Sequence, residues 1–423
     1  MHPLTIIELL TQLETAVRGR DRLRAIELGR QIQQRLVTDR HEHDAVERQV
    51  RELLAELDLQ TAGRTNDGSP PPRFLGSIDE AVVRGEPRSA DVPVQDGELF
   101  PVWFGTNRRP NLDGDGFTHE RHHSVTRGRA DVFVPEGHRF GEIGTSLWTK
   151  LKRFNLDDDK LRLQQVSQQQ RDDFFAEIRQ VHDSARETGQ TSHAVFFLHG
   201  FNVTFEAAAI RAAQIGFDLS VQGATAFFSW PSRGNVSAYP ADEATIEASE
   251  KAITDFLVDF TANCGADKVH VIAHSMGNRG LLRSLQRIAG NAQTRGKVKF
   301  GQVFLAAPDV DSDLFLDLAR LYPEHAERTT LYASDGDLPV HLSATLHDAP
   351  RAGYFTPYTV APGIDTVAVP DFDLDLLGHS YFAQAEALLY DMHGLIRQDQ
   401  KPAARPRITP DLHEGTSFWK LRR

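Results

Sequence analysis

The sequence predicts an α/β fold built on a mostly parallel, doubly wound sheet, preceded by a small N-terminal helical module. From about residue 97 onward, short apolar segments alternate with helical stretches. The later apolar segments are continuous in Val, Phe, Ile and Leu, a composition typical of strands buried on both faces. This alternation predicts parallel strands joined by crossover helices, with ligands bound beyond the carboxyl ends of the strands.

Residues 1–60 are predicted to form the helical module, because Leu, Ile and Val recur there at three- and four-residue intervals. A segment of about this length forms only a marginal core by itself. We therefore expect it to mediate oligomerisation or to act as an adaptor, binding a second copy or a partner protein. The alternative is a helical cap packed on the main domain. Residues 61–96 are predicted to be a linker, because their first part is polar and rich in Gly and Pro.

Residues 97–423 are predicted to form the sheet domain. The expected strands are 99–106, 130–135, 193–199, 224–230, 268–273, 301–306, 328–333 and 364–369. The expected helices are 205–220, 241–263, 277–289, 312–321 and a last stretch that ends near Leu395. Residues 397–423 are expected to be a solvated tail that crosses this domain.

Composition excludes several classes of protein. The chain has 423 residues, 40% of them hydrophobic, and a net charge of −12, whereas a general nucleic-acid surface needs a basic face. The single cysteine, Cys264, excludes an internal disulfide framework and a multi-cysteine zinc site, and it suits a reducing compartment. No apolar run approaches the ~20 residues of a membrane span, and the N-terminus does not resemble a signal peptide. We expect a cytoplasmic protein with no metal, cofactor, nucleic-acid partner or membrane span.

Ser275 is the candidate nucleophile. It stands in Ala273-His274-Ser275-Met276-Gly277, between a predicted strand and a predicted helix. A serine on such a sharp turn is a nucleophile elbow, which raises the hydroxyl above the sheet and needs small residues two positions before and after. Ala273 and Gly277 meet that requirement. The alternative is a buried or helix-capping serine.

The predicted strand before Gly200 ends in His199-Gly200-Phe201-Asn202. In an elbow architecture this loop and the residue after the nucleophile each supply a backbone N–H to the oxyanion, which identifies Phe201 and Met276. Gly200 lets the backbone approach the reacting carbonyl closely. His199 comes too early in the chain to be the base and is expected to brace the loop.

The acid and the base are expected after the nucleophile, in that order. His379 follows the last predicted strand and is the candidate base. Asp337 follows the preceding strand and is the candidate acid, with Asp335 in the same loop and Asp309 one strand earlier as alternatives. Weaker candidates for the base are His347 and His413, whereas His393, in the last predicted helix, is expected to be structural.

The substrate pocket is expected beside the loops that follow two of the strands. Trp230 and Tyr239 are candidate pocket residues, together with His199 and Gly200. Each of the two aromatic side chains could equally be packed in the core.

With these residues placed, the chain resembles the esterase/lipase-type alpha/beta hydrolases, in particular a bacterial branch catalogued as a domain of unknown function. The resemblance covers about residues 97–396. Besides the elbow, the matching segments are 104–108, 199–202, 228–232, 305–309, 332–334 with Asp337, 351–353 and 378–381. The family implies the alpha/beta-hydrolase fold and a Ser–His–Asp triad; it implies no particular substrate.

Three functions fit this constellation. The first is a serine hydrolase that cleaves a small-molecule carboxylic ester through an acyl-enzyme. The second uses the same triad on an amide, thioester or lipid, as the effector of a bacterial signalling or defence protein. The third is a non-catalytic scaffold used for binding, which the apparently complete triad argues against.

Overall fold

The computed structural model describes residues 12, 28, 97–112, 116–135, 161–189, 191–234, 238–334, 349–355, 358–369 and 382–422. Gly97–Arg423 forms one compact unit. Apart from residues 12 and 28, the predicted helical module and linker lie outside the described residues, so both stay predictions.

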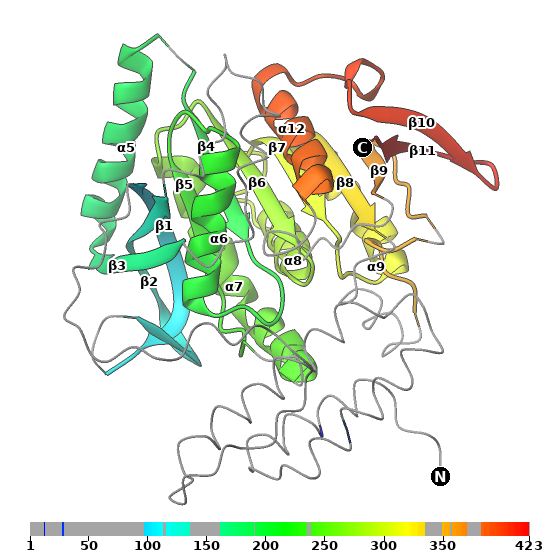
Figure 1. The fold of residues 1–423 in the computed structure, drawn as a ribbon. Coiled ribbons are helices and arrows are strands. Elements are labelled where there is room, and N and C mark those ends of the chain that lie inside the picture. Colours follow the sequence, from blue (N-terminus) through cyan, green and yellow to red (C-terminus); the bar gives the residue numbers. More distant parts are fainter. Residues whose placement is uncertain are drawn as a thin grey trace, which may run out of the picture. The chain divides into compact units, whose positions relative to one another are not determined.

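Within the described ranges, the sheet contains eleven strands. They are β1 (Gly97–Pro110), β2 (Phe117–Pro135), β3 (Arg162–Gln169), β4 (His193–Leu198), β5 (Thr225–Ser229), β6 (Lys268–His274), β7 (Phe300–Ala306), β8 (Ala326–Ser334), β9 (Ile364–Val369), β10 (Ile408–His413) and β11 (Thr416–Leu421). Their order across the sheet is β10-β11-β9-β8-β7-β6-β4-β5-β1-β2-β3 (Figure 1).

Every neighbouring pair from β1 through β5, β4, β6, β7, β8 and β9 to β11 is parallel. Antiparallel pairs occur only at the two sides among the described strands, where β2 and β3 extend one side and β10 the other. The predicted mostly parallel sheet is therefore confirmed. Because the central strands are parallel, their carboxyl ends meet at one edge, where the loops that follow β4, β5, β6 and β7 begin.

Helices cover both faces of the sheet (Figure 1). They are α5 (Arg171–Glu187), α6 (Phe205–Asp218), α7 (Tyr239–Asn263), α8 (Gly277–Gly290), α9 (Ser312–Leu318), α10 (Leu321–His325), α12 (Phe382–Gln398) and the 3-10 helix η4 (Pro402–Ala404). Buried residues of α5, α7, α8, α9 and α10 share one hydrophobic core, and those of α6 and α12 share the other. This is the doubly wound arrangement that crossover helices produce.

The sequence-based expectations were wrong about the C-terminal tail and about one helix. The tail at 397–423 is not a solvated segment: β10 and β11 form a hairpin, and Trp419 of β11 pairs with Val367 of β9. These two strands bury few side chains, so their apolar pattern is weak. The helix expected at 312–321 is divided into α9 and α10.

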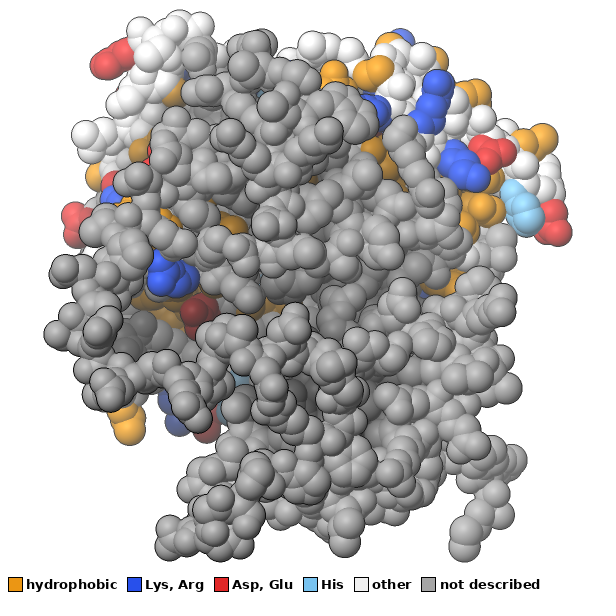
Figure 2. Space-filling model, in the orientation of Figure 1, with side chains coloured by type: hydrophobic (Ala, Val, Ile, Leu, Met, Phe, Trp, Pro, Cys, Tyr) orange, Lys and Arg blue, Asp and Glu red, His pale blue; other side chains and the backbone are white. Residues whose placement is uncertain are grey.

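The described surface near the β10–β11 hairpin mixes Lys or Arg, Asp or Glu and apolar side chains, without sorting them into one charged patch (Figure 2). Within the described part of the chain, each helix is either too short or too polar to traverse a lipid bilayer.

Candidate active site

Ser275 occupies the turn that joins β6 to α8. Its φ is +48°, and its side chain is buried. A non-glycine residue in this region is strained and persists only where its surroundings hold it. The Ser275 N–H donates to the Ala306 carbonyl at 2.9 Å, and its own carbonyl accepts from the N–H groups of Asn278 at 3.0 Å and Asp309 at 3.2 Å. Both α8 and the end of β7 therefore hold the strained turn.

The loop after β4 packs against this turn at Gly200. A Cβ on Gly200 would lie 3.0 Å from the Ser275 Cβ and 3.1 Å from the His274 Nδ1. Such a contact is tighter than side chains ordinarily make, so the small residue at position 200 permits the approach. The structure thus brings the predicted nucleophile and the predicted oxyanion loop together.

The two backbone N–H groups predicted to bind the oxyanion belong to Phe201 and Met276. Among the described residues, neither the Phe201 N–H nor the Met276 N–H donates a hydrogen bond. The two N–H groups that follow Phe201 are both engaged: Asn202 donates to Asp242 Oδ2 at 3.3 Å, and Val203 donates to Ser232 Oγ at 3.0 Å. The two donors predicted for the oxyanion therefore have no hydrogen-bond partner among the described residues.

His199 is completely surrounded by protein. Its Nδ1–H donates to the Gly200 carbonyl at 2.8 Å, and its Nε2 accepts from Ser229 Oγ at 3.4 Å. Its ring stacks on Trp230 with centroids 5.1 Å apart, and Trp230 Nε1 donates to the His199 carbonyl at 2.9 Å. Burial lowers the pKa of His199 to about 3, so the ring is neutral at physiological pH. His199 and Trp230 accordingly anchor the start of the oxyanion loop in the protein interior.

Tyr239 and Asp309 belong to a second buried group beside the elbow. The Tyr239 hydroxyl donates to Asp309 Oδ2 at 2.5 Å, and its ring meets the Phe201 ring edge-to-face at 5.2 Å. Arg279 Nη2 donates to Asp309 Oδ1 at 3.2 Å, and Arg351 Nε lies 3.6 Å from the same oxygen. The carboxylate of Asp309, an alternative acid, is thus bound to a tyrosine and two arginines.

The other predicted acid and base residues, Asp337, Asp335, His379 and His347, lie outside the described residues and stay predictions. The two strands that precede them, β8 and β9, are parallel to β6 in the sheet. His393, expected to be structural, donates from Nδ1 to the Leu219 carbonyl at 2.9 Å. The weaker candidate His413 is an exposed residue at the end of β10.

Arg108 and Asp242, for which the sequence predicted no role, are both fully buried near the oxyanion loop. The position of Arg108, a charged residue at the end of an apolar strand, could have indicated a buried role. Asp242 lies within a predicted helix, and nothing in the sequence near it indicates such a role. No group of three or more His, Cys, Asp or Glu within the described ranges is arranged to hold a metal ion.

A family model described as alpha/beta hydrolase of unknown function (DUF900) matches residues 176–398. No curated protein matches the chain. Among solved structures, an uncharacterized protein from Bacillus cereus ATCC 10987 is similar at 13% identity, with a TM-score of 0.33, over 50% of this chain and 61% of that one. The chain therefore spans less than two thirds of that protein. An esterase from Pyrobaculum calidifontis is similar at 12% identity, with a TM-score of 0.31, over 73% of this chain and 86% of that one.

Proposed function

This chain belongs to the alpha/beta hydrolases of unknown function, and we propose on that premise that it is a serine hydrolase that cleaves a carboxylic ester through an acyl-enzyme. The observation that carries the proposal is the strained, buried turn at Ser275, which faces the loop of Phe201 across Gly200. A strained turn of this kind presents a serine hydroxyl to a substrate carbonyl.

The proposed reaction begins when His379 takes the proton from the Ser275 hydroxyl and the oxygen attacks the ester carbonyl. The Phe201 and Met276 N–H groups, which have no hydrogen-bond partner among the described residues, donate to the oxyanion that forms. Asp337 holds the His379 tautomer and stabilises the imidazolium. His379 then protonates the leaving alcohol, and a water molecule repeats the sequence on the acyl-enzyme.

Labelling with a fluorophosphonate probe tests the nucleophile. The wild-type chain should form one covalent adduct, located on Ser275 by peptide mass, and Ser275→Ala should form none. The matched control is Ser284→Ala, because Ser284 is a buried serine on α8 whose Oγ accepts from Thr254 Oγ1 at 3.0 Å, away from the elbow. Ser284→Ala should label like the wild type.

A panel of p-nitrophenyl esters, thioesters, amides and lipids then identifies the bond that is cleaved. Ser275→Ala should lower the turnover of the best ester by about a million-fold. Turnover of an ester by a folded Ser275→Ala chain would contradict the proposal. Absence of labelling in the folded wild type would favour a non-catalytic scaffold.

A further inference from the structure

Arg108 connects three segments around the oxyanion loop. It stands near the end of β1 and is 1% exposed. Its Nη2 donates to the Val203 carbonyl at 2.7 Å, its Nη1 donates to the Ser232 carbonyl at 2.9 Å, and its Nε donates to Ser229 Oγ at 2.8 Å. One guanidinium thus ties the loops after β4 and β5 to β1.

Asp242 holds the same two loops from the first turn of α7. It is fully buried, and its Oδ2 accepts from the Asn202 N–H at 3.3 Å and from Ser232 Oγ at 2.5 Å. Its Oδ1 accepts from the Arg233 N–H at 2.9 Å. Asn202 has a φ of +60°, a left-handed conformation that persists in a non-glycine residue when its surroundings hold it.

Burial removes water from both charged groups and so disfavours their charged forms. Burial lowers the pKa of Arg108 to about 9, which still leaves it charged at neutral pH, and attraction to Asp242 opposes that shift. Burial also raises the pKa of Asp242. Because the desolvation penalty of buried charges can exceed the attraction between them, stability alone does not account for this pair.

Hydrogen bonds hold the loop residues both before and after Phe201. After Phe201, the N–H of Asn202 and the N–H and carbonyl of Val203 are bound by Asp242, Ser232 and Arg108. Before it, the His199 Nδ1–H donates to the Gly200 carbonyl, which lies in the same peptide plane as the Phe201 N–H. The His199 Nε2 accepts from Ser229 Oγ, which in turn accepts from Arg108. The peptide plane that carries the Phe201 N–H is therefore fixed at both ends.

We propose that Arg108 and Asp242 are positioning residues that aim the Phe201 N–H at the oxyanion. They act through the loop and do not touch the substrate. The inference rests on the proposed function, because it assigns a purpose to an N–H that matters only if an oxyanion forms beside Ser275.

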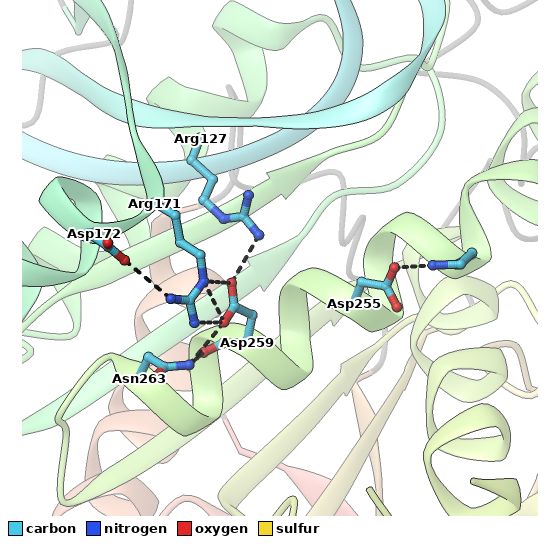
Figure 3. Close-up of polar contacts among 7 residues, drawn as sticks. Arg127, Arg171, Asp172, Asp255, Asp259 and Asn263 are labelled. Atoms are coloured by element: carbon cyan, nitrogen blue, oxygen red, sulfur yellow. Dashed lines mark hydrogen bonds and ion pairs between the residues drawn. The ribbon is translucent and has the colours of Figure 1, made fainter. Parts of the chain in front are cut away.

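A matched control lies at the other end of α7 (Figure 3). Arg127 from β2 and Arg171 from α5 point toward Asp259, with Arg127 Nη2 2.9 Å and Arg171 Nε 3.0 Å from Asp259 Oδ2. Asp259 and Asp242 are roughly 25 Å apart along α7 at the rise of an α-helix. Arg127→Met and Asp259→Asn therefore break an arginine–aspartate contact of the same helix without reaching the oxyanion loop.

The test compares full-length Arg108→Met, Arg108→Lys and Asp242→Asn with these controls, using the best p-nitrophenyl ester. Loss of one oxyanion donor lowers kcat by about a hundredfold to a thousandfold, and we expect Arg108→Met to lose kcat on this scale with KM changed less than about threefold. Arg108→Lys should remain slow, because an ammonium cannot reproduce the three directions of the guanidinium bonds. Asp242→Asn should also be slow, and both controls should keep the wild-type kcat.

A second measurement separates positioning from a general loss of structure. A trifluoromethyl ketone, which forms a tetrahedral adduct with serine, should bind the Arg108 and Asp242 variants more weakly by the same factor as the loss of kcat. The product carboxylic acid should bind unchanged. If Arg108→Met does not fold, Arg108→Lys and Asp242→Asn provide the same comparison.

Wild-type kcat in folded Arg108 and Asp242 variants would overturn the inference and leave the proposed function standing. Equal weakening of the ketone and of the product acid would also overturn it, because the pair would then have only a structural role. A wild-type chain that neither labels at Ser275 nor hydrolyses any ester would overturn the proposed function and this inference together.

Discussion

A Cβ atom on Gly277 would lie 2.6 Å from the carbonyl oxygen of His199. The carbonyl oxygen of Leu198 would be equally close. The first residue of α8 and the end of β4 are therefore packed at backbone distance, and only glycine permits it. This contact lets α8 begin two residues after Ser275 with its first turn packed against the end of β4.

Gly277→Ala should destabilise the chain by about 1–3 kcal/mol, because its Cβ meets rigid backbone oxygens, and it should also slow fluorophosphonate labelling of Ser275. The control is Gly290→Ala at the other end of α8, where a Cβ would meet nothing within 4 Å. That variant should match the wild type or be slightly more stable. Urea denaturation and the labelling rate measure both effects. Equal behaviour of the two variants would show that the elbow is not packed in this way.

Asp337→Asn should lower kcat by roughly ten-thousand-fold through a wrongly held imidazole tautomer. Asp335→Asn should cost far less. Asp309→Asn should chiefly lower stability, because the Asp309 carboxylate binds Tyr239 and Arg279 in a buried position. Ester kinetics and thermal unfolding of the three variants separate these effects. If the first two come out reversed, Asp335 is the acid.

Stability should fall as the pH falls below about 6.5, because several histidines are held neutral by the fold. Burial lowers the pKa of His199 and His270 to about 3 and that of His182 to about 4. The unfolded chain takes up protons near pH 6.5 and the folded chain does not, so the stability present above pH 6.5 is lost between there and the folded pKa values. Each histidine contributes a slope of about 1.4 kcal/mol per pH unit.

His270→Gln tests this assignment. His270 Nδ1 accepts from the Gln302 N–H at 2.9 Å, and its Nε2 lies 2.8 Å from His193 Nδ1. Urea denaturation at pH 7.5, 6.0 and 5.0 should show a shallower dependence of the unfolding free energy on pH in the variant than in the wild type. An unchanged slope would mean that His270 takes up a proton as readily in the folded chain as in the unfolded chain.

A chain that begins at Phe74 should fold and hydrolyse a small ester, because every proposed catalytic group lies between Phe201 and His379. It should also run closer to a monomer by light scattering than the full-length chain, since the apolar stripes predicted in residues 1–60 need a partner surface. An insoluble or inactive truncated chain would instead indicate that these residues form a cap of the main domain. An unchanged oligomeric state would place the association surface within 97–423.

The parallel sheet was predictable because strands buried on both faces appear in the sequence as short, continuous apolar runs. The apolar runs at 193–199 and 268–273 match β4 and β6 to within a residue, and Ser275 follows β6 as the elbow pattern requires. Small residues at 273 and 277 are visible in the sequence itself. The edge strands β3 and β10, and β11 beside β10, were missed, because a strand that buries few of its residues resembles a polar loop.

By itself, the sequence determined the central parallel strands, most of the helices around them and the identity of the nucleophile candidate, since each depends on residues close together in the chain. Only the tertiary structure decided that Asp309 binds Tyr239 and Arg279, and that Arg108 and Asp242 hold the loop of Phe201. A buried charge must find partners among the groups that folding brings within hydrogen-bond distance. Those groups come from distant segments, and no local pattern of the chain specifies them.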